Sequence, residues 1–369
     1  MTRPTFTIGI EEEYQTVDPV TFDLRSHIQT EIMAKGKRQM HERVKAEMHQ
    51  AVIEVGTGVC KNIKDATTDL KDLRRRMVAL TEEHGLLLVS GATHPFADWR
   101  AQDIHPDERY LQIVEDLQIV ARANLIFGLH VHVGIDDKEV LIQLMNQIRY
   151  FLPHLLALSS NSPFWIGMNT GLKSYRCKVF DRFPRTNIPE RFQSWSDFEN
   201  FVNLLVRTRC IDNGKKIWWD IRPHPFFDTV EIRICDVPMR ADETIAIAAL
   251  IQATAAMLYN LHERNINWRA YSRALLMENK WRALRYGLDG SLIDFGREME
   301  VPERELILEY LGLVDDVLDD LDSREEVNHV RHILDTGTGA DRQLRVYEES
   351  GHDLKKVVAY MAEETRAGL

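Results

Sequence analysis

Three consecutive glutamates, Glu11, Glu12 and Glu13, lie near the start of the chain. Side chains alternate between the two faces of a β-strand, so Glu11 and Glu13 would share one face. Ile8, Ile10 and Glu12 would share the other. Two carboxylates on one face are suited to hold a hard divalent cation, because Mg²⁺ and Mn²⁺ prefer oxygen ligands. The alternative for a single Glu-x-Glu pair is an ordinary solvated strand face.

Two later segments repeat this design, with polar residues at every second position between apolar ones. The polar residues are His130, His132, Glu231 and Arg233. If the three segments are strands of one sheet, their polar side chains line a common concavity that suits divalent cations and a phosphate-bearing substrate. Taken alone, a His-x-His pair is commonly structural, and a Glu-x-Arg pair is commonly a cross-strand ion pair. It is their joint occurrence on otherwise apolar strands that favours a nucleotide site with Mg²⁺ or Mn²⁺.

A further pair of carboxylates, Glu47 and Glu54, is separated by seven positions. In one regular strand the two would point to opposite faces. They could bind the same cation only if a bulge or a loop lies between them. Glu54 is the stronger candidate because an apolar, glycine-containing strand follows it, and Glu47 is the weaker one.

Three arginines are candidates for gripping phosphate or carboxylate in two-point fashion, Arg176, Arg222 and Arg233. Arg176 lies in a loop-rich stretch from 159 to about 192, and long loops without structure of their own are often functional. For each arginine the alternative is an ordinary surface or ion-paired side chain. The GxxxxGK[ST] and GxGxxG fingerprints are absent from the sequence, so neither a P-loop nor a Rossmann mode of nucleotide binding is expected.

The hydrophobic pattern predicts an α+β chain, with separated strands followed by a helical block from about 241. The apolar run Thr244–Leu258 reads as a buried helix, because it is shorter than the roughly 20 residues of a membrane span. No linker or repeat interrupts the chain, so one domain is expected over 1–369. The predicted strands are 5–14, 52–59, 86–90, 127–135, 217–222 and 229–236, and the predicted helices before the block are 64–84, 106–123 and 138–158, the last interrupted near Pro153.

Composition limits the partners. The net charge of −11 disfavours nucleic acid, which binds through Lys and Arg, and favours small-molecule or metal ligands. No secretory signal precedes the first strand, so a cytoplasmic protein that binds no membrane is expected. The four cysteines form no CxxC pair and predict mostly buried, reduced thiols. The acidic run Asp315, Asp316, Asp319 and Asp320 is better explained as a solvated helix face than as a metal site.

Short motifs spread over nearly the whole chain carry a family resemblance. They are Gly9-Ile-Glu-Glu-Glu13 with Val17-Asp-Pro19, Gly91-Ala-Thr-His-Pro-Phe96, Gly128-Leu-His-Val-His-Val-Gly134, Asn161-Ser-Pro-Phe-Trp165, Ser174-Tyr-Arg176, Trp219-Asp-Ile-Arg-Pro223, Glu231-Ile-Arg-Ile-Cys-Asp236, Trp281-Arg-Ala-Leu-Arg-Tyr-Gly-Leu-Asp289 and Gly337-Thr-Gly-Ala-Asp-Arg342. With these motifs the chain resembles the carboxylate-amine ligases related to type 2 glutamate-cysteine ligase, within the glutamine synthetase-like superfamily.

The resemblance implies a curved, largely antiparallel sheet whose concave face holds ATP and two or three Mg²⁺ ions, with helices packed behind it. It places Arg176, Arg222 and Arg233 at phosphate or carboxylate contacts, and His132 beside the amino-acid or phosphate site. Arg233, Arg176 and His132 are therefore the expected catalytic residues. The metal-binding positions that it implies are Glu11, Glu13, Glu54, His130, Glu231 and, less securely, Glu47.

The activity that the resemblance implies is the ATP-dependent joining of a carboxylate to an amine through an acyl phosphate. Glutamate and cysteine are the default pair, but members share the ATP machinery while their acid and amine differ. Other readings stay open: another acid and amine, amide hydrolysis, a kinase for a carboxylate or guanidino group, and an ATP-sensing regulator that is not an enzyme. A homodimer or a higher homo-oligomer is also open.

Overall fold

An antiparallel sheet forms the centre of the structure, a computed structural model that describes residues 3–26 and 29–369. Its strands lie in the order β2-β3-β1-β5-β9-β8, and β4 pairs with β1 beside this path. All the pairings are antiparallel, as expected from the sequence. The strands are β1 (Ile8–Val17), β2 (Val44–Ala46), β3 (Val52–Gly56), β4 (Leu87–Val89), β5 (Leu129–Gly134), β8 (Ile221–Pro223) and β9 (Thr229–Ile232).

The two faces of β1 differ as the alternation predicts. Ile8 and Ile10 are buried in the core, whereas Glu11 and Glu13 lie on the other face, in contact with a pocket. Glu12 is on the core face and fully buried, where both its oxygens accept hydrogen bonds from Arg74. A buried carboxylate needs such a partner. The core face is therefore closed, and only the opposite face has carboxylates available for a ligand.

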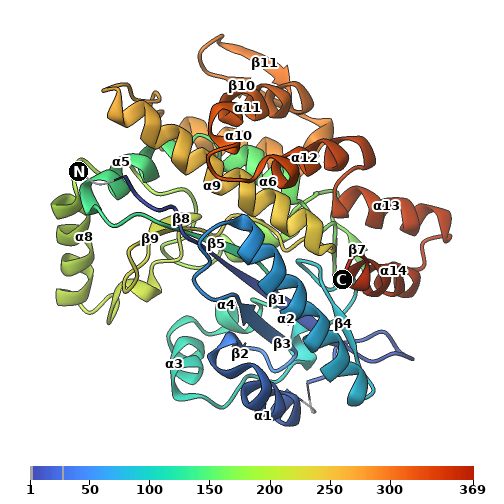
Figure 1. Cartoon of the computed structure of the whole chain (residues 1–369). Helices are drawn as coiled ribbons and strands as arrows, with labels where there is room; N and C mark the ends of the chain where they lie inside the picture. The colour runs from blue at the N-terminus through green and yellow to red at the C-terminus, as the bar shows by residue number, and fades with distance from the viewer. Residues whose placement is uncertain (1–2, 27–28) are drawn as a thin grey trace.

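Helices cover the core face of the sheet. Figure 1 shows α2 and α9 lying across the strands, with the C-terminal helices packed outside α9. Arg74 of α2 and Thr244 of α9 both bond Glu12, which ties the two helices to β1. The helices are α1 (Gln29–Met40), α2 (Ile63–Glu83), α3 (Glu108–Leu117), α4 (Ile119–Arg122), α5 (Lys138–Ile148), α6 (Leu152–Ser159), α7 (Tyr175–Phe180), α8 (Trp195–Arg207), α9 (Ala241–Glu263), α10 (Arg273–Tyr286), α11 (Glu303–Leu318), α12 (Arg324–Thr336), α13 (Gly339–Glu349) and α14 (Leu354–Arg366).

Helix α9 contains the predicted buried segment. It is long and apolar enough to cross a membrane by length and composition, but 89% of its most apolar window is buried inside the protein. It contacts the sheet at β5 and packs on α2, α5, α11 and α12. An all-round apolar helix is expected in the core of a large domain, so α9 is the central core helix.

The structure corrects several predicted boundaries. The predicted helix 138–158 divides into α5 and α6, with Pro153 in the first turn of α6, where proline is tolerated. The predicted helix 106–123 divides at Gln118, whose φ of 51° leaves the helical region. Of the predicted strand 217–222, only the end belongs to the sheet.

The C-terminal block from about 241 is mainly helical, but the sequence pattern did not predict its two strands. It contains a hairpin of β10 (Ser291–Asp294) and β11 (Met299–Pro302). Asp294 Oδ1 accepts hydrogen bonds from the backbone N–H groups of Gly296 and Arg297, so the turn is fixed by a side chain. The predicted loop-rich stretch likewise contains α7 and a small hairpin of β6 (Phe164–Trp165) and β7 (Met168–Asn169).

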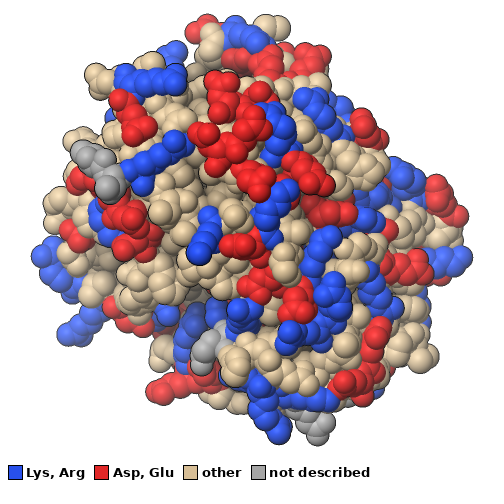
Figure 2. All heavy atoms as spheres, viewed as in Figure 1, with Lys and Arg blue, Asp and Glu red and all other residues tan. Residues whose placement is uncertain are grey.

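The acidic run on α11 is a solvated face. Asp315 and Asp319 pair with Arg324 at the start of α12, and all three side chains are exposed. On the face shown in Figure 2, acidic and basic side chains lie side by side over these helices. Cys60, Cys177 and Cys235 are buried free thiols, as expected, whereas Cys210 is exposed.

Candidate active site

A pocket of about 600 Å³ lies on the polar face of the sheet. The residues predicted from the sequence come from five strands, one turn and one helix that are far apart along the chain. The structure brings every one of them to the wall of this pocket, namely Glu11, Glu13, Glu47, Glu54, His130, His132, Arg176, Arg222, Glu231 and Arg233.

Strand register sets the first cross-strand row. Glu13 of β1 lies directly opposite Glu54 of β3, and Lys45 of β2 lies opposite Glu54 on its other side. Like charges directly opposite each other destabilise a sheet. The Lys45 ammonium offsets part of this repulsion, donating to Glu54 Oε1 at 2.8 Å and to Glu11 Oε1 at 3.3 Å.

Glu47 joins this row from the turn between β2 and β3. Glu47 follows the last residue of β2, and Glu54 lies in the middle of β3. Because β2 and β3 are adjacent and antiparallel, the two carboxylates come close without a bulge in either strand. Carboxylate oxygens of Glu13, Glu47 and Glu54 lie within 4.8 Å of one another. Glu47, the weaker of the two predictions, therefore lies in the same group of carboxylates as Glu54.

All three carboxylates have raised pKa values. Burial, followed by the charge of a neighbouring glutamate, raises the pKa of Glu13 to about 7, of Glu47 to about 7 and of Glu54 to about 8. Each carboxylate loses hydration and gains too little positive charge in return. We call Glu13, Glu47 and Glu54 the carboxylate triad.

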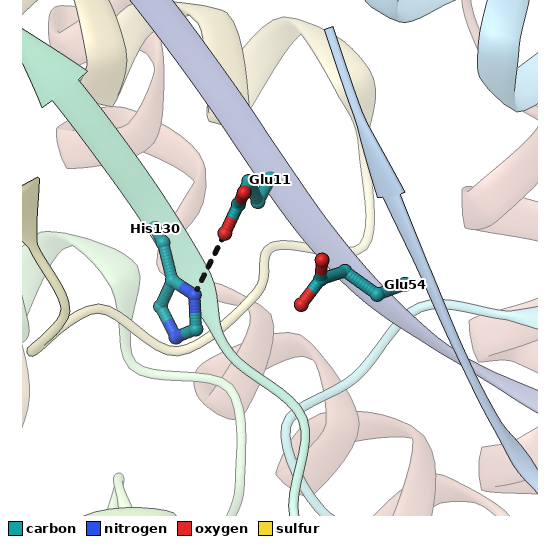
Figure 3. A group of neighbouring side chains, drawn as sticks. All are labelled: Glu11, Glu54 and His130. Carbon is teal, nitrogen blue, oxygen red and sulfur yellow. Dashed lines mark ion pairs between the residues drawn. The ribbon is translucent and has the colours of Figure 1, made fainter. Parts of the chain in front are cut away.

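Glu54 also belongs to a second group, with Glu11 and His130, whose ligand atoms again lie within 4.8 Å of one another. In Figure 3 the three side chains project from neighbouring strands toward a common space. Glu11 and His130 are directly opposite in the register, and His130 Nδ1 is 3.5 Å from Glu11 Oε2. Burial raises the pKa of Glu11, but the nearby imidazoles of His130 and His132 outweigh it and hold that pKa well below the usual value. Burial and then Arg233 lower the pKa of His130 to about 4, so its imidazole is neutral and able to ligate a metal.

A third row surrounds Glu231. His132 lies opposite it on β5, and Arg222 lies opposite it on β8. Arg222 Nε donates to Glu231 Oε2 at 2.7 Å, and Arg233 forms an ion pair with Oε1. Burial acts to raise the pKa of Glu231, but the two arginines outweigh it and hold that pKa well below the usual value. We call Glu231, Arg222 and Arg233 the arginine-flanked group.

The arginines differ in how many donors they have left. Arg222 uses Nε and Nη2 on Glu231 and Nη1 on two backbone carbonyls, so its fork is occupied. Arg233 and Arg176 each keep a buried Nε without a partner among the described residues. A substrate phosphate therefore has donors from Arg233 and Arg176, while the geometry of Arg222 suits the positioning of Glu231.

Arg176 lies beneath the strands and not in an open loop. Its guanidinium donates to the carbonyl oxygens of Ile234 and Arg233 and occupies the space above Gly128, where a Cβ would lie 2.3 Å from Nη2. Any larger residue at position 128 would clash with this guanidinium, so the position requires glycine.

Several sequence motifs form the support behind the pocket. Asp236 is fully buried and accepts hydrogen bonds from Asn161 N–H and from the hydroxyls of Ser162 and Ser174. Gly339 packs on Asn161, where a Cβ would lie 2.1 Å from Oδ1. These motifs hold the end of β9 and α7 in place, so they position Arg233 and Arg176 without reaching the pocket themselves.

The sequence reasoning missed the two ends of the pocket. One end has Lys215, His224, Phe226 and Phe227, and the other has His49, His105, Arg109, Tyr110 and Asn124. Lys45 was missed as well, although its place two residues before Glu47 in a short strand was a usable signal. The others lie in turns and loops, whose place in space no periodicity predicts.

The donor set fits a hard divalent cation. The oxygens of Glu11, Glu13, Glu47 and Glu54 with one imidazole are the ligands that Mg²⁺ or Mn²⁺ accept. The raised pKa values of the triad indicate buried carboxylates whose negative charge the neighbouring cations offset only in part. A bound cation would supply that charge, and Glu54, which belongs to both groups, would lie between two such cations.

Comparisons with known proteins agree with this geometry. The chain is 66% identical over 367 residues to a protein of Solibacter usitatus that is provisionally named glutamate–cysteine ligase 2, covering 100% of this chain and 95% of that protein. Two solved structures are similar in fold. The first is a bifunctional glutathione synthetase from Pasteurella multocida, with a TM-score of 0.72 and 14% identity, which matches 98% of this chain and 52% of that one. The second is the glutamate–cysteine ligase of Francisella tularensis in complex with AMP, with a TM-score of 0.67 and 13% identity, which matches 100% of this chain and 90% of that one.

At these identities the solved structures show a shared mixed fold of helices and antiparallel sheet, and this chain spans about half of the bifunctional protein. The membership of the glutamine synthetase-like superfamily stays a prediction. The family model described as glutamate-cysteine ligase family 2 matches residues 7–360, which is nearly the whole chain. The chain therefore belongs to glutamate-cysteine ligase family 2 and is an ATP-dependent carbon–nitrogen ligase.

Proposed function

We propose that the pocket on the sheet joins a small carboxylic acid to an amine by way of an acyl phosphate. The acid's carboxylate oxygen attacks the γ-phosphorus of ATP and ADP leaves. The amine nitrogen then attacks the acyl carbon, phosphate leaves, and the nitrogen loses a proton. Phosphorylation converts a poor leaving group into a good one, so one hard step becomes two easier ones. Glutamate and cysteine are the first acid and amine to test.

The observation that carries this proposal is the juxtaposition of Glu13 and Glu54. Two buried carboxylates directly opposite each other, with raised pKa values, need more positive charge than Lys45 and the nearby arginines supply. Mg²⁺ held by the triad and by Glu11 and His130 would neutralise the charge of the phosphates and orient them. Phosphoryl transfer asks a protein for positioning and charge neutralisation more than for covalent chemistry.

The chain's own cations would act on the transferring phosphate from the other side. Arg233 is partly buried, with Nη1 on Glu231 and Nε without a partner, so it offers a donor with a fixed direction. Arg176 offers its own Nε from beneath the strands. In a pocket with little water, donors fixed in advance stabilise developing charge without reorganising.

His132 is suited to a role beside the phosphate or the amine. Burial acts to lower its pKa, but the carboxylates of Glu11, 3.9 Å from Nε2, and of Glu231 outweigh this and raise it above the usual value. Its Nε2 is buried without a hydrogen-bond partner among the described residues. An imidazole with a raised pKa can accept the proton that the attacking amine loses.

The test is ADP release by the purified chain with ATP and Mg²⁺ over a panel of carboxylates and amines, with mass spectrometry of the products. An amide formed in step with ADP is the expected result and names the substrates. ADP with a phosphorylated acid but no amide would instead indicate a kinase. Hydrolysis of an amide without ATP, or ATP binding without turnover on any pair, would also overturn the proposal.

A further inference from the structure

The end of the pocket beyond Glu47 is built from three segments. The turn after Glu47 pairs with the chain at 103–105, where His49 bridges Ile104 and His105 N–H donates to the Met48 carbonyl oxygen at 2.8 Å. The Tyr110 hydroxyl donates to the Ala46 carbonyl oxygen at 2.8 Å. The third segment contributes Asn124 and Ile126 just before β5. This end is therefore a fixed wall and not a free loop.

The wall contains buried polar atoms that have no hydrogen-bond partner among the described residues. His49 is 2% exposed, and neither of its ring nitrogens is bonded. His105 Nδ1 and Asn124 Oδ1 are in the same state, and all three side chains line the pocket. Buried polar groups in proteins are nearly always bonded. Several unbonded ones at one end of a substrate pocket indicate that a ligand supplies the missing partners.

The charges around this wall are mixed. Arg109 and Asp107 lie on the pocket's rim, one cationic and one anionic. An amide oxygen and a carboxylate accept from an ammonium group, whereas a guanidinium and an imidazole N–H donate to a carboxylate. The set therefore matches a zwitterionic head group better than a purely anionic or apolar one.

The distance from the triad limits the size of the ligand. His49 is two positions after Glu47, with Met48 between them, and two residues of chain span at most about 7 Å. A molecule whose carboxylate reaches the triad and whose head group reaches His49 is therefore short, with the carboxyl group a few bonds from the head.

We propose that His49 and Asn124 bind the head group of the substrate acid and determine which acid the enzyme activates. The inference rests on the proposed function, because it assumes that an acid is phosphorylated at the triad. Asn124 Oδ1 accepts a hydrogen bond from the ammonium of the acid, and the His49 imidazole bonds its α-carboxylate. The acid's other carboxylate then faces the metal groups.

The experiment is calorimetric binding of L-glutamate, L-aspartate and glutarate to the full chain with Mg²⁺ and a non-hydrolysable ATP analogue. Glutarate has the two carboxylates of glutamate but lacks the ammonium. In wild type we expect at least one amino acid of the panel to bind, and glutamate to bind more tightly than glutarate. Failure of all three to bind the wild-type chain would overturn the assignment.

Three variants separate binding from folding. Asn124→Leu should weaken glutamate about tenfold and leave glutarate within twofold, because only the ammonium contact is lost. His49→Phe should weaken both about tenfold, and His49→Gln, which keeps hydrogen-bonding atoms, should restore part of the loss. Lys356→Met, an exposed lysine of α14 outside the pocket, is the control and should leave acid binding within twofold.

Two outcomes would contradict the assignment. If His49→Phe binds both acids like wild type, ordered water satisfies the imidazole and His49 has no ligand role. If Asn124→Leu weakens glutamate and glutarate equally, the loss is structural. Binding of the ATP analogue is measured in parallel, so loss of nucleotide binding in wild type would indicate failure of the proposed function, whereas retained nucleotide binding isolates the acid subsite.

Discussion

The floor of the pocket has two halves, and each half contains buried glutamate. The pKa values of these glutamates are shifted in opposite directions. In the arginine-flanked group, Glu231 is buried between Arg222 and Arg233, and its pKa lies well below the usual value. In the carboxylate triad, Glu13 and Glu54 are buried opposite each other, and their pKa values are raised to about 7 and about 8.

The difference shows where the protein supplies its own counter-charge and where it needs one from outside. The arginine-flanked group is complete as folded, because every oxygen of Glu231 has a cation. Among the described residues, the triad's one ion pair is with Lys45, on the edge strand β2, with half its side chain exposed. The charges of Arg176, Arg233 and Arg109 also act on Glu13 and Glu47, but they do not offset burial. The same residue type, glutamate, is thus neutralised by arginines in one half and is left short of positive charge in the other.

The largest expected effect is on catalysis. Glu54→Gln removes a ligand from both metal groups, so turnover should fall about 10³-fold or more. Without metal, the variant should be no less stable than wild type, because the change relieves repulsion with Glu13. Steady-state ADP release and urea unfolding in EDTA measure the two effects. Turnover within tenfold of wild type would remove Glu54 from the metal groups.

The next effect is on stability and sharpens the comparison. Glu231→Gln leaves two buried arginines without their carboxylate, so the free energy of unfolding should fall by about 3 kcal/mol, in addition to a loss of turnover. Urea unfolding in EDTA, with Glu54→Gln as the matched glutamate-to-glutamine control, tests this. If both variants have equal metal-free stability, the two halves do not differ as described.

The third effect is a dependence on pH. A carboxyl whose pKa is raised on folding stabilises the folded protein fully below its unfolded pKa near 4.5. This stabilisation is lost as the pH rises to the pKa of the folded state. Below about pH 6.5 the buried and half-buried histidines whose pKa values are lowered to about 4 oppose this trend, because they gain stability as pH rises to their unfolded pKa. Metal-free stability should therefore fall between about pH 6.5 and pH 8, by more than the roughly 1.4 kcal/mol that one pKa unit represents. The stabilisation by Mg²⁺ should grow over the same window.

The pKa shifts of Glu11 and Glu231 have the opposite sign to those of the triad. Their lowered pKa values add stability above about pH 4.5 that is lost on further acidification, so they are constant over the window of the triad. Urea titrations at pH 5, 6.5 and 8, with EDTA or with Mg²⁺, measure the trend. Metal-free stability that rises steadily from pH 6.5 to pH 8 would refute the raised pKa values of the triad.

The smallest effect concerns Lys45. Its ammonium contacts Glu11 and Glu54, two residues of one metal group, so it competes with a cation for their oxygens. Lys45→Met should tighten Mn²⁺ binding about threefold, a modest gain because the lysine is half exposed. Calorimetry measures it, and Lys37→Met, which removes a charge elsewhere along the pocket wall, is the control. Weaker Mn²⁺ binding in Lys45→Met than in the control would contradict the competition.

Much of this site was predictable because strands have a fixed period. Alternation placed Glu11 and Glu13 on the face opposite Ile8 and Ile10, and the structure confirms it. It likewise separated Glu231 from Val230 and Ile232, which are buried in the core. The buried helix α9 was predicted from its apolar run, whereas the largely antiparallel sheet was predicted only from the family resemblance. The β10–β11 hairpin was missed because its turn is fixed by a single side chain, Asp294, which leaves no periodic signal.

The sequence by itself determined which residues share a face of each strand, because that depends only on local backbone geometry. Only the tertiary structure decided that Glu13 lies opposite Glu54, that Arg222 is consumed by Glu231, and that Arg176 lies under Gly128. Register and burial are set by contacts between distant segments, and they determine whether a buried carboxylate is paired or is left to bind a cation.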